Sequence, residues 1–252
     1  MAPSPRVALV TGAAVRIGRA IALGLAADGW TVAVHHHRST GDARAVVDRI
    51  VRGGGRARAF AADLGREAAV GALIPRIARA LGPVSLLVNN ASVFEYDDVA
   101  TADRRSWNRH LAVNLRAPFV LAQRLAAQLP PRVAGHIVNL LDQRVWRLTP
   151  YFMSYTVSKA GLWTLTQTLA MALAPRVRVN AIGPGPTLPS TRQTAADFRR
   201  QVAATPLERG ATPEEICDAV RFILAAPAMT GQMIALDGGQ HLPGRVRRAE
   251  KE

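Results

Sequence analysis

Tyr155 and Lys159 form the pair of side chains in this sequence best suited to move a proton. They stand four residues apart in a segment with helical periodicity, so a helix would place both on one face. An ammonium beside a phenol favours the phenolate, and we therefore expect Lys159 to lower the pKa of Tyr155. Such a pair also arises by chance on ordinary helices. A chemical role is favoured because, of 32 basic residues, only Lys159 and Lys251 are lysines.

The turn from Thr11 to Arg19 could bind a phosphate. It follows an apolar run and opens a helical segment, where backbone N–H groups and the helix dipole attract anions. Gly12 permits a tight turn and Gly18 permits close packing of helix on strand, with Arg16 and Ile17 between them. The same residues could also form a turn without a ligand. Because the P-loop pattern G-x-x-x-x-G-K-[ST] is missing, nucleotide kinases and GTPases are disfavoured.

His37, Arg38 and Ser39 follow the second apolar run, where a dinucleotide would place its adenosine ribose. An acidic residue there binds the hydroxyls of NAD, whereas cationic side chains accept the 2′-phosphate of NADP. No Asp or Glu occurs in this stretch before Asp42, and arginine and serine both hydrogen-bond phosphate. We therefore predict NADPH as the cofactor. A metal site at the histidines is the alternative; no carboxylate-rich segment adjoins them, and we predict no metal.

Short apolar runs that alternate with helical segments must position these residues. The runs contain Val, Leu and Ile without strict polar alternation, which is typical of strands buried on both faces of a parallel sheet. We predict a single doubly wound α/β fold of the Rossmann type, with about seven strands and helices on both faces. Pro75 predicts a kink in its helix or a later start. The expected strands are Arg6–Val10, Thr31–His35, Ala57–Ala61, Ser85–Asn89, His136–Leu140, Val177–Ile182 and Met233–Leu236, and the expected helices include Ile17–Ala27, Glu67–Leu81, Trp107–Gln128 and Tyr155–Ala174.

Composition excludes several classes of protein. The 252 residues are 49% hydrophobic and 20% charged, which excludes intrinsic disorder. The single cysteine, Cys217, excludes a disulfide framework and indicates the cytoplasm, and no apolar run is long enough for a transmembrane helix. The net charge of +14 comes from scattered arginines, so we predict no nucleic-acid partner and attribute the charge to a phosphorylated ligand. We expect one domain over residues 1–242 and a mobile basic tail over residues 243–252.

Several motifs over residues 6–242 resemble the short-chain dehydrogenase/reductase family. They are Thr-Gly-x-x-x-x-x-Gly at 11–18, Asn89-Asn90-Ala91, Asn114, Tyr155-x-x-x-Lys159 and Pro184-Gly185. Within that family the chain is similar to pteridine and dihydromonapterin reductases, through Arg16 in place of the usual glycine, the sequence His-x-His-Arg-Ser at 35–39 and the ending at 236–242.

The resemblance implies a cofactor site and a proton path. Asn114 would hold a water in that path, and Lys159 would also hydrogen-bond the nicotinamide ribose. Asp142 stands 13 residues before Tyr155, where most of the family has serine, and pteridine reductases share this departure. The expected catalytic residues are Asp142, Tyr155, Lys159 and Asn114. The expected NADPH-binding residues are Gly12, Arg16, Ile17, Gly18, His37, Arg38, Ser39, Asp63, Leu64, Asn90, Ala91, Tyr155, Lys159, Pro184 and Gly185.

The resemblance also implies a substrate site. Phe94 would stack on a pterin ring, and Ser92 and Arg16 would hydrogen-bond the ligands beside Asp142 and Tyr155. By itself Phe94 could equally be a core residue, and Asp142 could cap a turn. Further candidates for the pocket wall are Trp146, Tyr151, Phe152 and the loop at 185–194.

The resemblance thus implies an NADPH-dependent reductase of a dihydropterin or dihydrofolate, with Tyr155 as the proton donor. Three alternatives remain open: a general carbonyl reductase for a ketone, sugar or 3-oxoacyl thioester, a non-catalytic NADP(H)-binding sensor, and a nucleic-acid-binding protein. Intact Tyr155, Lys159 and Asn114 argue against the sensor, which needs no proton path. The family also implies a homotetramer, assembled through the two long helical segments.

Overall fold

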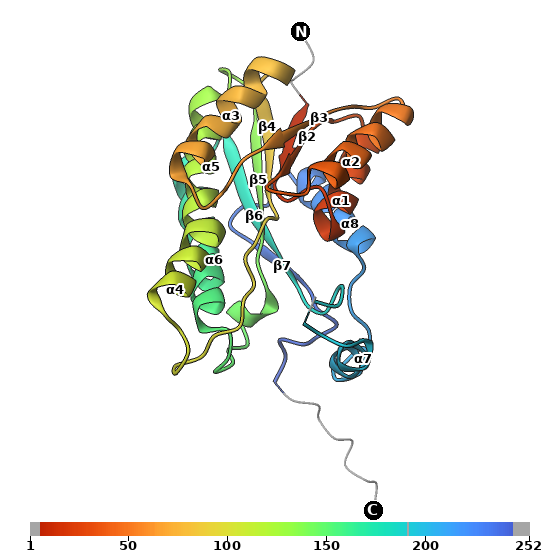
Figure 1. Cartoon of the computed structure of the whole chain (residues 1–252). Helices are drawn as coiled ribbons and strands as arrows, with labels where there is room; N and C mark the ends of the chain where they lie inside the picture. Colours follow the sequence, from red (N-terminus) through yellow and green to blue (C-terminus); the bar gives the residue numbers. More distant parts are fainter. Residues whose placement is uncertain (1–5, 191, 244–252) are drawn as a thin grey trace, which may run out of the picture.

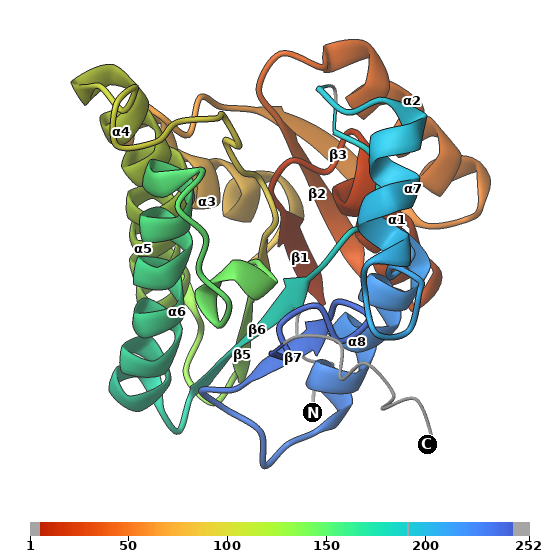
Figure 2. The same cartoon turned by 90° about the horizontal axis from the view of Figure 1, so that it is seen from below.

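A single seven-stranded parallel sheet organises the chain (Figures 1 and 2). The structure is a computed structural model that describes residues 6–190 and 192–243. The strands lie in the order β3-β2-β1-β4-β5-β6-β7. Their bounds are β1 Val7–Val10, β2 Thr31–His36, β3 Arg56–Ala61, β4 Val84–Asn89, β5 Gly135–Leu140, β6 Val177–Pro184 and β7 Met233–Leu236. The predicted doubly wound fold is confirmed, and each expected strand is present within two residues of its predicted bounds.

The strand order reverses direction at β1, which pairs with β2 on one side and β4 on the other. Val10, the last residue of β1, is in register with Val34 and with Val88. In open parallel sheets, ligands bind beyond the carboxyl ends of the strands at such a reversal, because the connections leave in opposite directions and open a crevice. The topology therefore places the ligand site beside residues 11–18.

Helices cover both faces of the sheet and bury its apolar side chains (Figure 1). Leu9, Leu87 and Ile137 face one helical layer, whereas Val10, Val34 and Val88 face the other. The first layer contains α3 Glu67–Leu81, α5 Ala117–Gln128 and α6 Met153–Leu173. The second contains α1 Arg16–Ala27, α2 Thr40–Arg52 and α8 Pro213–Ala225. Helix α7, Ala195–Ala203, lies outside these layers, below α1 and α8 in the view of Figure 1.

Two helical predictions need correction. Helix α3 starts at Glu67 and runs through Pro75, so the expectation of a later start is wrong. The expected helix Trp107–Gln128 is three elements: α4 Arg104–Leu111, a π-helical segment η1 Ala112–Arg116, and α5. Helix α4 begins before Trp107 because the Asp103 carboxylate accepts a hydrogen bond from the Ser106 N–H at 2.6 Å.

Within the described ranges, no helix is both long and apolar enough to cross a bilayer. The basic residues expected to form a mobile tail, Arg245, Arg247, Arg248 and Lys251, lie outside those ranges.

Candidate active site

Asn90 fixes the turn after β1 to the end of β4. Its side-chain amide donates hydrogen bonds to the carbonyl oxygens of Thr11 at 2.8 Å and Gly12 at 3.2 Å. In return, the Thr11 hydroxyl oxygen accepts from the backbone N–H groups of Asn90 and Ala91, at 2.9 and 3.0 Å. The two segments that the sequence predicts to hold the cofactor are therefore joined by four hydrogen bonds across the topological switch point.

The turn itself needs glycine at two positions. Gly12 has a φ of +64°, a conformation that side chains disfavour. At Gly18 a Cβ atom would lie 2.3 Å from the Gly12 carbonyl oxygen and 2.5 Å from the Asn90 amide nitrogen. Arg16 also has a positive φ, +55°, which explains why glycine suits this position in the wider family. Glycine at position 18 thus lets the start of α1 pack closely against the turn and against Asn90.

His35 supports this turn from β2, and the sequence analysis did not assign it a role. Its buried ring accepts a hydrogen bond from the Gly12 N–H at Nδ1, 3.1 Å away, and contacts the Ala62 carbonyl oxygen through Nε2 at 3.1 Å. Both bonds can form only when the ring is neutral with its proton on Nε2. Burial lowers the pKa of His35 to about 4, so this neutral form persists at physiological pH.

The end of β2 carries exposed cationic side chains. Arg38 is exposed, and Ser39 precedes α2 without capping it through its side chain. His37 lies 3.8 Å from the Asp63 carboxylate, whose other oxygen accepts from the Gly65 N–H at 2.9 Å. The predicted residues Leu64 and Ile17 pack in the interior, Leu64 fully and Ile17 in part. Arg38 and Ser39 are therefore free to meet a phosphate, whereas Asp63 shapes its own loop.

Arg16 reaches to the loop that follows β6. Its guanidinium donates to the carbonyl oxygens of Leu188 at 3.1 Å and Pro189 at 2.9 Å. The loop leaves β6 through Pro184 and Gly185; the Gly185 N–H donates to the Leu236 carbonyl at 3.0 Å. Arg16 therefore couples the turn after β1 to this loop, a contact that the sequence did not predict; its predicted role toward phosphate and pterin stays a prediction.

Tyr155 and Asp142 form the chemical centre of the site. The Tyr155 hydroxyl donates a hydrogen bond to Asp142 Oδ2 at 2.9 Å. The other carboxylate oxygen, Oδ1, accepts from the Arg144 N–H at 2.9 Å and caps the short 3₁₀ turn η2 Gln143–Val145. Asp142 thus both caps a turn and contacts Tyr155, although the sequence analysis set these as alternatives. The buried Lys159 ammonium donates to the Leu140 carbonyl oxygen at 2.7 Å.

The expected effect of Lys159 on Tyr155 is wrong in this structure. The pKa of Tyr155 is raised well above its usual value, first by burial and then by the Asp142 carboxylate. The Lys159 ammonium lies 5.7 Å from the centre of the Tyr155 ring and is directed to a backbone carbonyl. Burial lowers the pKa of Lys159 to about 8, with Asp142 opposing that shift. The phenol therefore keeps its proton, and of the two groups Lys159 is the one whose pKa lies closer to neutral pH.

Asp97 fixes the start of α6 and was also missed by the sequence analysis. Its buried carboxylate accepts from the Ser154 N–H at 3.1 Å and from the Ser106 hydroxyl at 2.9 Å. Its carbonyl oxygen accepts from the Phe152 N–H at 2.7 Å. These bonds satisfy donors that the first turn of a helix leaves free. They set the position of Tyr155, which lies in the same turn.

Asn114 lies in the π-helical segment and fastens the chain that follows β4. Its amide nitrogen donates to the Val93 carbonyl at 2.9 Å and the Ser158 hydroxyl at 3.0 Å. Its oxygen accepts from the Val93 N–H at 2.8 Å and the Ser92 hydroxyl at 3.2 Å. These partners occupy the side chain, so the water expected at Asn114 would have to meet its backbone carbonyl instead.

Phe94 lies beside Tyr155 in an aromatic cluster. Its ring stacks on Phe152 at a centroid distance of 4.5 Å and meets the Tyr155 ring edge-on at 4.6 Å. Tyr151 instead stacks on Tyr96, and Trp146 lies against His241, so both sit at the rim of the site. The structure therefore brings Phe94, Asp142 and Tyr155 together with Phe152, whereas the Ser92 hydroxyl is bonded to Asn114; the substrate-binding role of these residues stays a prediction.

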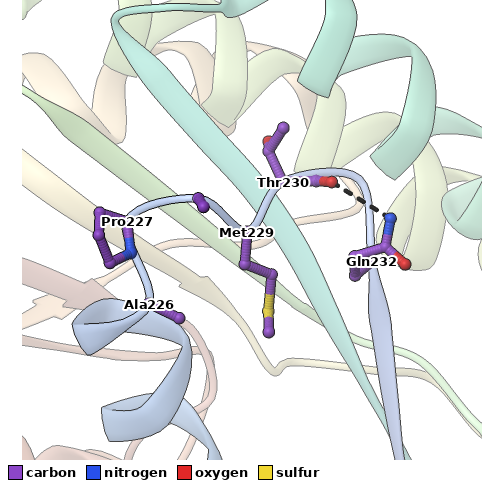
Figure 3. A pocket seen from close by; sticks show the side chains of 6 residues that line it. Ala226, Pro227, Met229, Thr230 and Gln232 are labelled. Atoms are coloured by element: carbon purple, nitrogen blue, oxygen red, sulfur yellow. Dashed lines mark hydrogen bonds between the residues drawn. The ribbon is translucent and has the colours of Figure 1, made fainter.

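A separate hollow of about 470 Å³ lies in the loop between α8 and β7 (Figure 3). It is lined by Ala226, Pro227, Ala228, Met229, Thr230 and Gln232, which precede β7. Because all strands are parallel, this loop is at the amino edge of the sheet, opposite Asp142 and Tyr155. In the part of the chain that the structure describes, no three His, Cys, Asp or Glu side chains are grouped to hold a metal.

Comparison with known proteins gives three kinds of match. The family profile described as enoyl-(acyl carrier protein) reductase matches residues 12–241. A 3-oxoacyl-[acyl-carrier-protein] reductase of Staphylococcus epidermidis is 33% identical, over 93% of this chain and 98% of that protein.

Among solved structures, the FolM alternative dihydrofolate reductase 1 of Brucella suis, in complex with NADP, is 50% identical. Its TM-score is 0.92, with 95% of this chain and 96% of that chain covered. A short-chain dehydrogenase of Burkholderia cenocepacia, also in complex with NADP, is 33% identical with a TM-score of 0.87, covering 94% of this chain and 98% of that one.

Proposed function

Because this chain belongs to the short-chain dehydrogenase/reductase family, we propose that it is an NADPH-dependent reductase of a dihydropterin or dihydrofolate. The observation that carries the proposal is the hydrogen bond from Tyr155 to Asp142, where most of the family has serine. A serine hydroxyl is neutral, whereas the Asp142 carboxylate accepts from Tyr155 and keeps that phenol protonated, so that it can donate to a ring nitrogen. The half-identical FolM structure in complex with NADP supports the same reading.

The described residues fit the cofactor. The turn with Gly12 leads into the start of α1, and the exposed Arg38 and half-buried Ser39 lie where the 2′-phosphate of NADPH would be bound. Lys159 would hold the nicotinamide ribose and Asn90 the turn below the phosphates. When bound, NADPH supplies the hydride.

The protein supplies the proton. Tyr155, with its raised pKa, stays protonated and points at Asp142. In the proposed reaction the Tyr155 hydroxyl delivers a proton to the ring nitrogen of the substrate C=N bond. Lys159, with a pKa of about 8, would pass a proton back to Tyr155 and regain it from solvent through a water held by the Asn114 carbonyl. Phe94 would stack on the pterin ring, with Ser92 and Arg16 as its hydrogen-bonding neighbours.

The test is an NADPH-oxidation assay with dihydrofolate, dihydrobiopterin, dihydromonapterin and a panel of ketones. Turnover of a pterin or folate substrate above that of every carbonyl compound supports the proposal. Faster turnover of the carbonyl compounds would instead support the second candidate, a general carbonyl reductase. That candidate is favoured by the 33% identity to a 3-oxoacyl-[acyl-carrier-protein] reductase.

We also propose that the enzyme is a cytoplasmic homotetramer. An apolar hollow of about 320 Å³ on α4, η1, α5 and α6 supports a subunit contact at this face. It is lined by Leu111, Ala112, Leu115, Arg116, Phe119 and Leu165. Light scattering coupled to size-exclusion chromatography measures the assembly, and a monomer would contradict it.

A further inference from the structure

Two arginines flank the aromatic cluster beside Tyr155. The Arg144 guanidinium carbon lies 5.7 Å from the centre of the Phe94 ring and 5.1 Å from that of Phe152. The Arg192 guanidinium carbon lies 5.3 and 5.9 Å from the same two rings. A stacked aromatic pair between two cations attracts ligands that combine a flat ring with negative charge.

The two arginines differ in whether a nearby carboxylate neutralises their charge. Arg144 lies 3.6 Å from the Asp142 carboxylate, and its side chain is 19% exposed. Arg192 is exposed and donates to the backbone carbonyl of Phe94, and no carboxylate of the described residues lies within ion-pair distance of it. Glu95, next to Phe94, is already paired with Arg109 at 2.6 Å. Of the two arginines beside the aromatic cluster, Arg192 is therefore the one whose charge no described carboxylate matches and whose remaining N–H groups can bind a ligand.

Arg16 is not placed to bind a ligand beside the aromatic cluster. Its guanidinium is bound to the carbonyl oxygens of Leu188 and Pro189, on the turn side of the same loop. Arg192 leaves that loop towards Phe94, on the side of the aromatic cluster. Arg16 is therefore the cation beside the expected cofactor turn, and Arg192 is the cation beside the expected position of the substrate ring.

We propose that Arg192, with Arg144 behind it, binds a carboxylate on the substituent of the substrate ring. The proposal rests on the proposed function and narrows its substrate class. A guanidinium presents a planar fork that matches a carboxylate, and it gains little from a neutral polyol chain. The site is thereby selective for a folate-type substrate, whose ring bears an aminobenzoyl-glutamate, over pterins with an uncharged side chain.

The test compares Arg192→Gln with Arg199→Gln, using dihydrofolate and dihydromonapterin as substrates. Glutamine keeps a donor for the Phe94 carbonyl but removes the charge; Arg199, exposed on α7, loses the same charge away from the rings. We expect Arg192→Gln to lower kcat/KM for dihydrofolate by about tenfold or more, through KM, because a charge-assisted hydrogen bond is lost. Dihydromonapterin turnover, the KM for NADPH and the Arg199→Gln enzyme should change less than about twofold.

The outcomes separate the two proposals. An equal loss with both substrates means that Arg192 only supports the cluster, and no loss with either means that it binds no carboxylate; both overturn the inference. A rise confined to the KM for NADPH assigns Arg192 to the cofactor and overturns it as well. If the unmodified enzyme reduces neither substrate, the proposed function fails instead.

Discussion

The hydroxyl of Tyr155 and the carboxylate of Asp142 share a hydrogen bond of 2.9 Å at the carboxyl edge of the sheet. The bond holds the phenol in its protonated form, because a nearby negative charge and burial both oppose the phenolate. Without a ligand, the site thus holds a proton on Tyr155 that it can donate once a suitable acceptor is bound. A substrate nitrogen or the arriving cofactor must alter this contact before the proton can leave.

Replacement of Tyr155 by Phe tests the proton donor. The variant keeps the ring and its edge-on contact with Phe94, at 4.6 Å, but has no hydroxyl for Asp142. We expect kcat to fall by at least about 10²-fold, the usual contribution of a general acid. The dissociation constant for NADPH, measured by fluorescence titration, should stay within about threefold. Turnover close to that of the unmodified enzyme would assign the proton to another group, with Asp142 as the first candidate.

Replacement of Asp142 separates a pterin substrate from a carbonyl one. Asp142→Ser restores the residue found in most of the family but removes the carboxylate that contacts Tyr155. Dihydropterin turnover should fall by about 10²-fold or more, while ketone turnover is kept or rises. Asp142→Asn serves as a control because its amide oxygen can still cap the turn at Arg144. Full pterin turnover by the serine variant would remove the main support for a pterin substrate.

Cofactor choice depends on Arg38 and Ser39 at the end of β2. Two charge-assisted hydrogen bonds to the 2′-phosphate predict a preference for NADPH over NADH of roughly 10- to 100-fold in KM. Arg38→Asp should abolish or reverse that preference, since its carboxylate repels the phosphate and accepts from ribose hydroxyls. Steady-state kinetics with both cofactors measure it, with Arg44→Asp on α2 as a matched charge change. Equal KM values in the unmodified enzyme would contradict the assignment.

Acid stability should depend on His35. Its pKa is about 4 in the folded chain against 6.5 when unfolded, so the unfolded state binds the extra proton between these values. The free energy of unfolding is therefore fully present above about pH 6.5 and falls as the pH drops towards 4, by roughly 3 kcal/mol for this group. His136, also lowered to about 4 by burial and by Arg178, acts in the same direction.

Urea denaturation at about pH 5 and about pH 7.5 checks this dependence. His35→Asn keeps an acceptor for the Gly12 N–H but cannot be protonated, so the variant should lose part of the pH dependence. The unmodified protein at the same two pH values serves as the reference. An identical acid loss in the unmodified protein and the His35→Asn variant would show that other groups cause it.

The sheet was predictable because each strand is a short apolar run, and burial on both faces leaves a clear local pattern. The division of the Trp107–Gln128 segment into three elements was not predictable. The π-helical turn is accompanied by hydrogen bonds from Asn114 to Val93 and Ser158, which are far away in the sequence. His35 escaped notice for a similar reason. Its partners are backbone atoms of Gly12 and Ala62, which carry no residue-type signature.

The pKa of Tyr155 was predicted in the wrong direction for a different reason. The spacing of Tyr155 and Lys159 places them on one face, but it does not say where the ammonium points. Lys159 turns to the Leu140 carbonyl, whereas Asp142 reaches the phenol from another element. Whether neighbouring groups raise or lower a pKa depends on such orientations, which only the folded chain defines.

Because Lys159 is buried, its chemical modification can report when the site opens. The chain has one other lysine, Lys251, which lies outside the described residues. Modification of Lys159 can therefore be followed in a single tryptic or chymotryptic peptide. With a pKa of about 8, its amine is partly uncharged at neutral pH and intrinsically reactive, but it is buried against the Leu140 carbonyl. Acylating reagents therefore modify Lys159 only as often as the site opens. Mass spectrometry of that peptide reads out this opening directly, without any turnover of substrate.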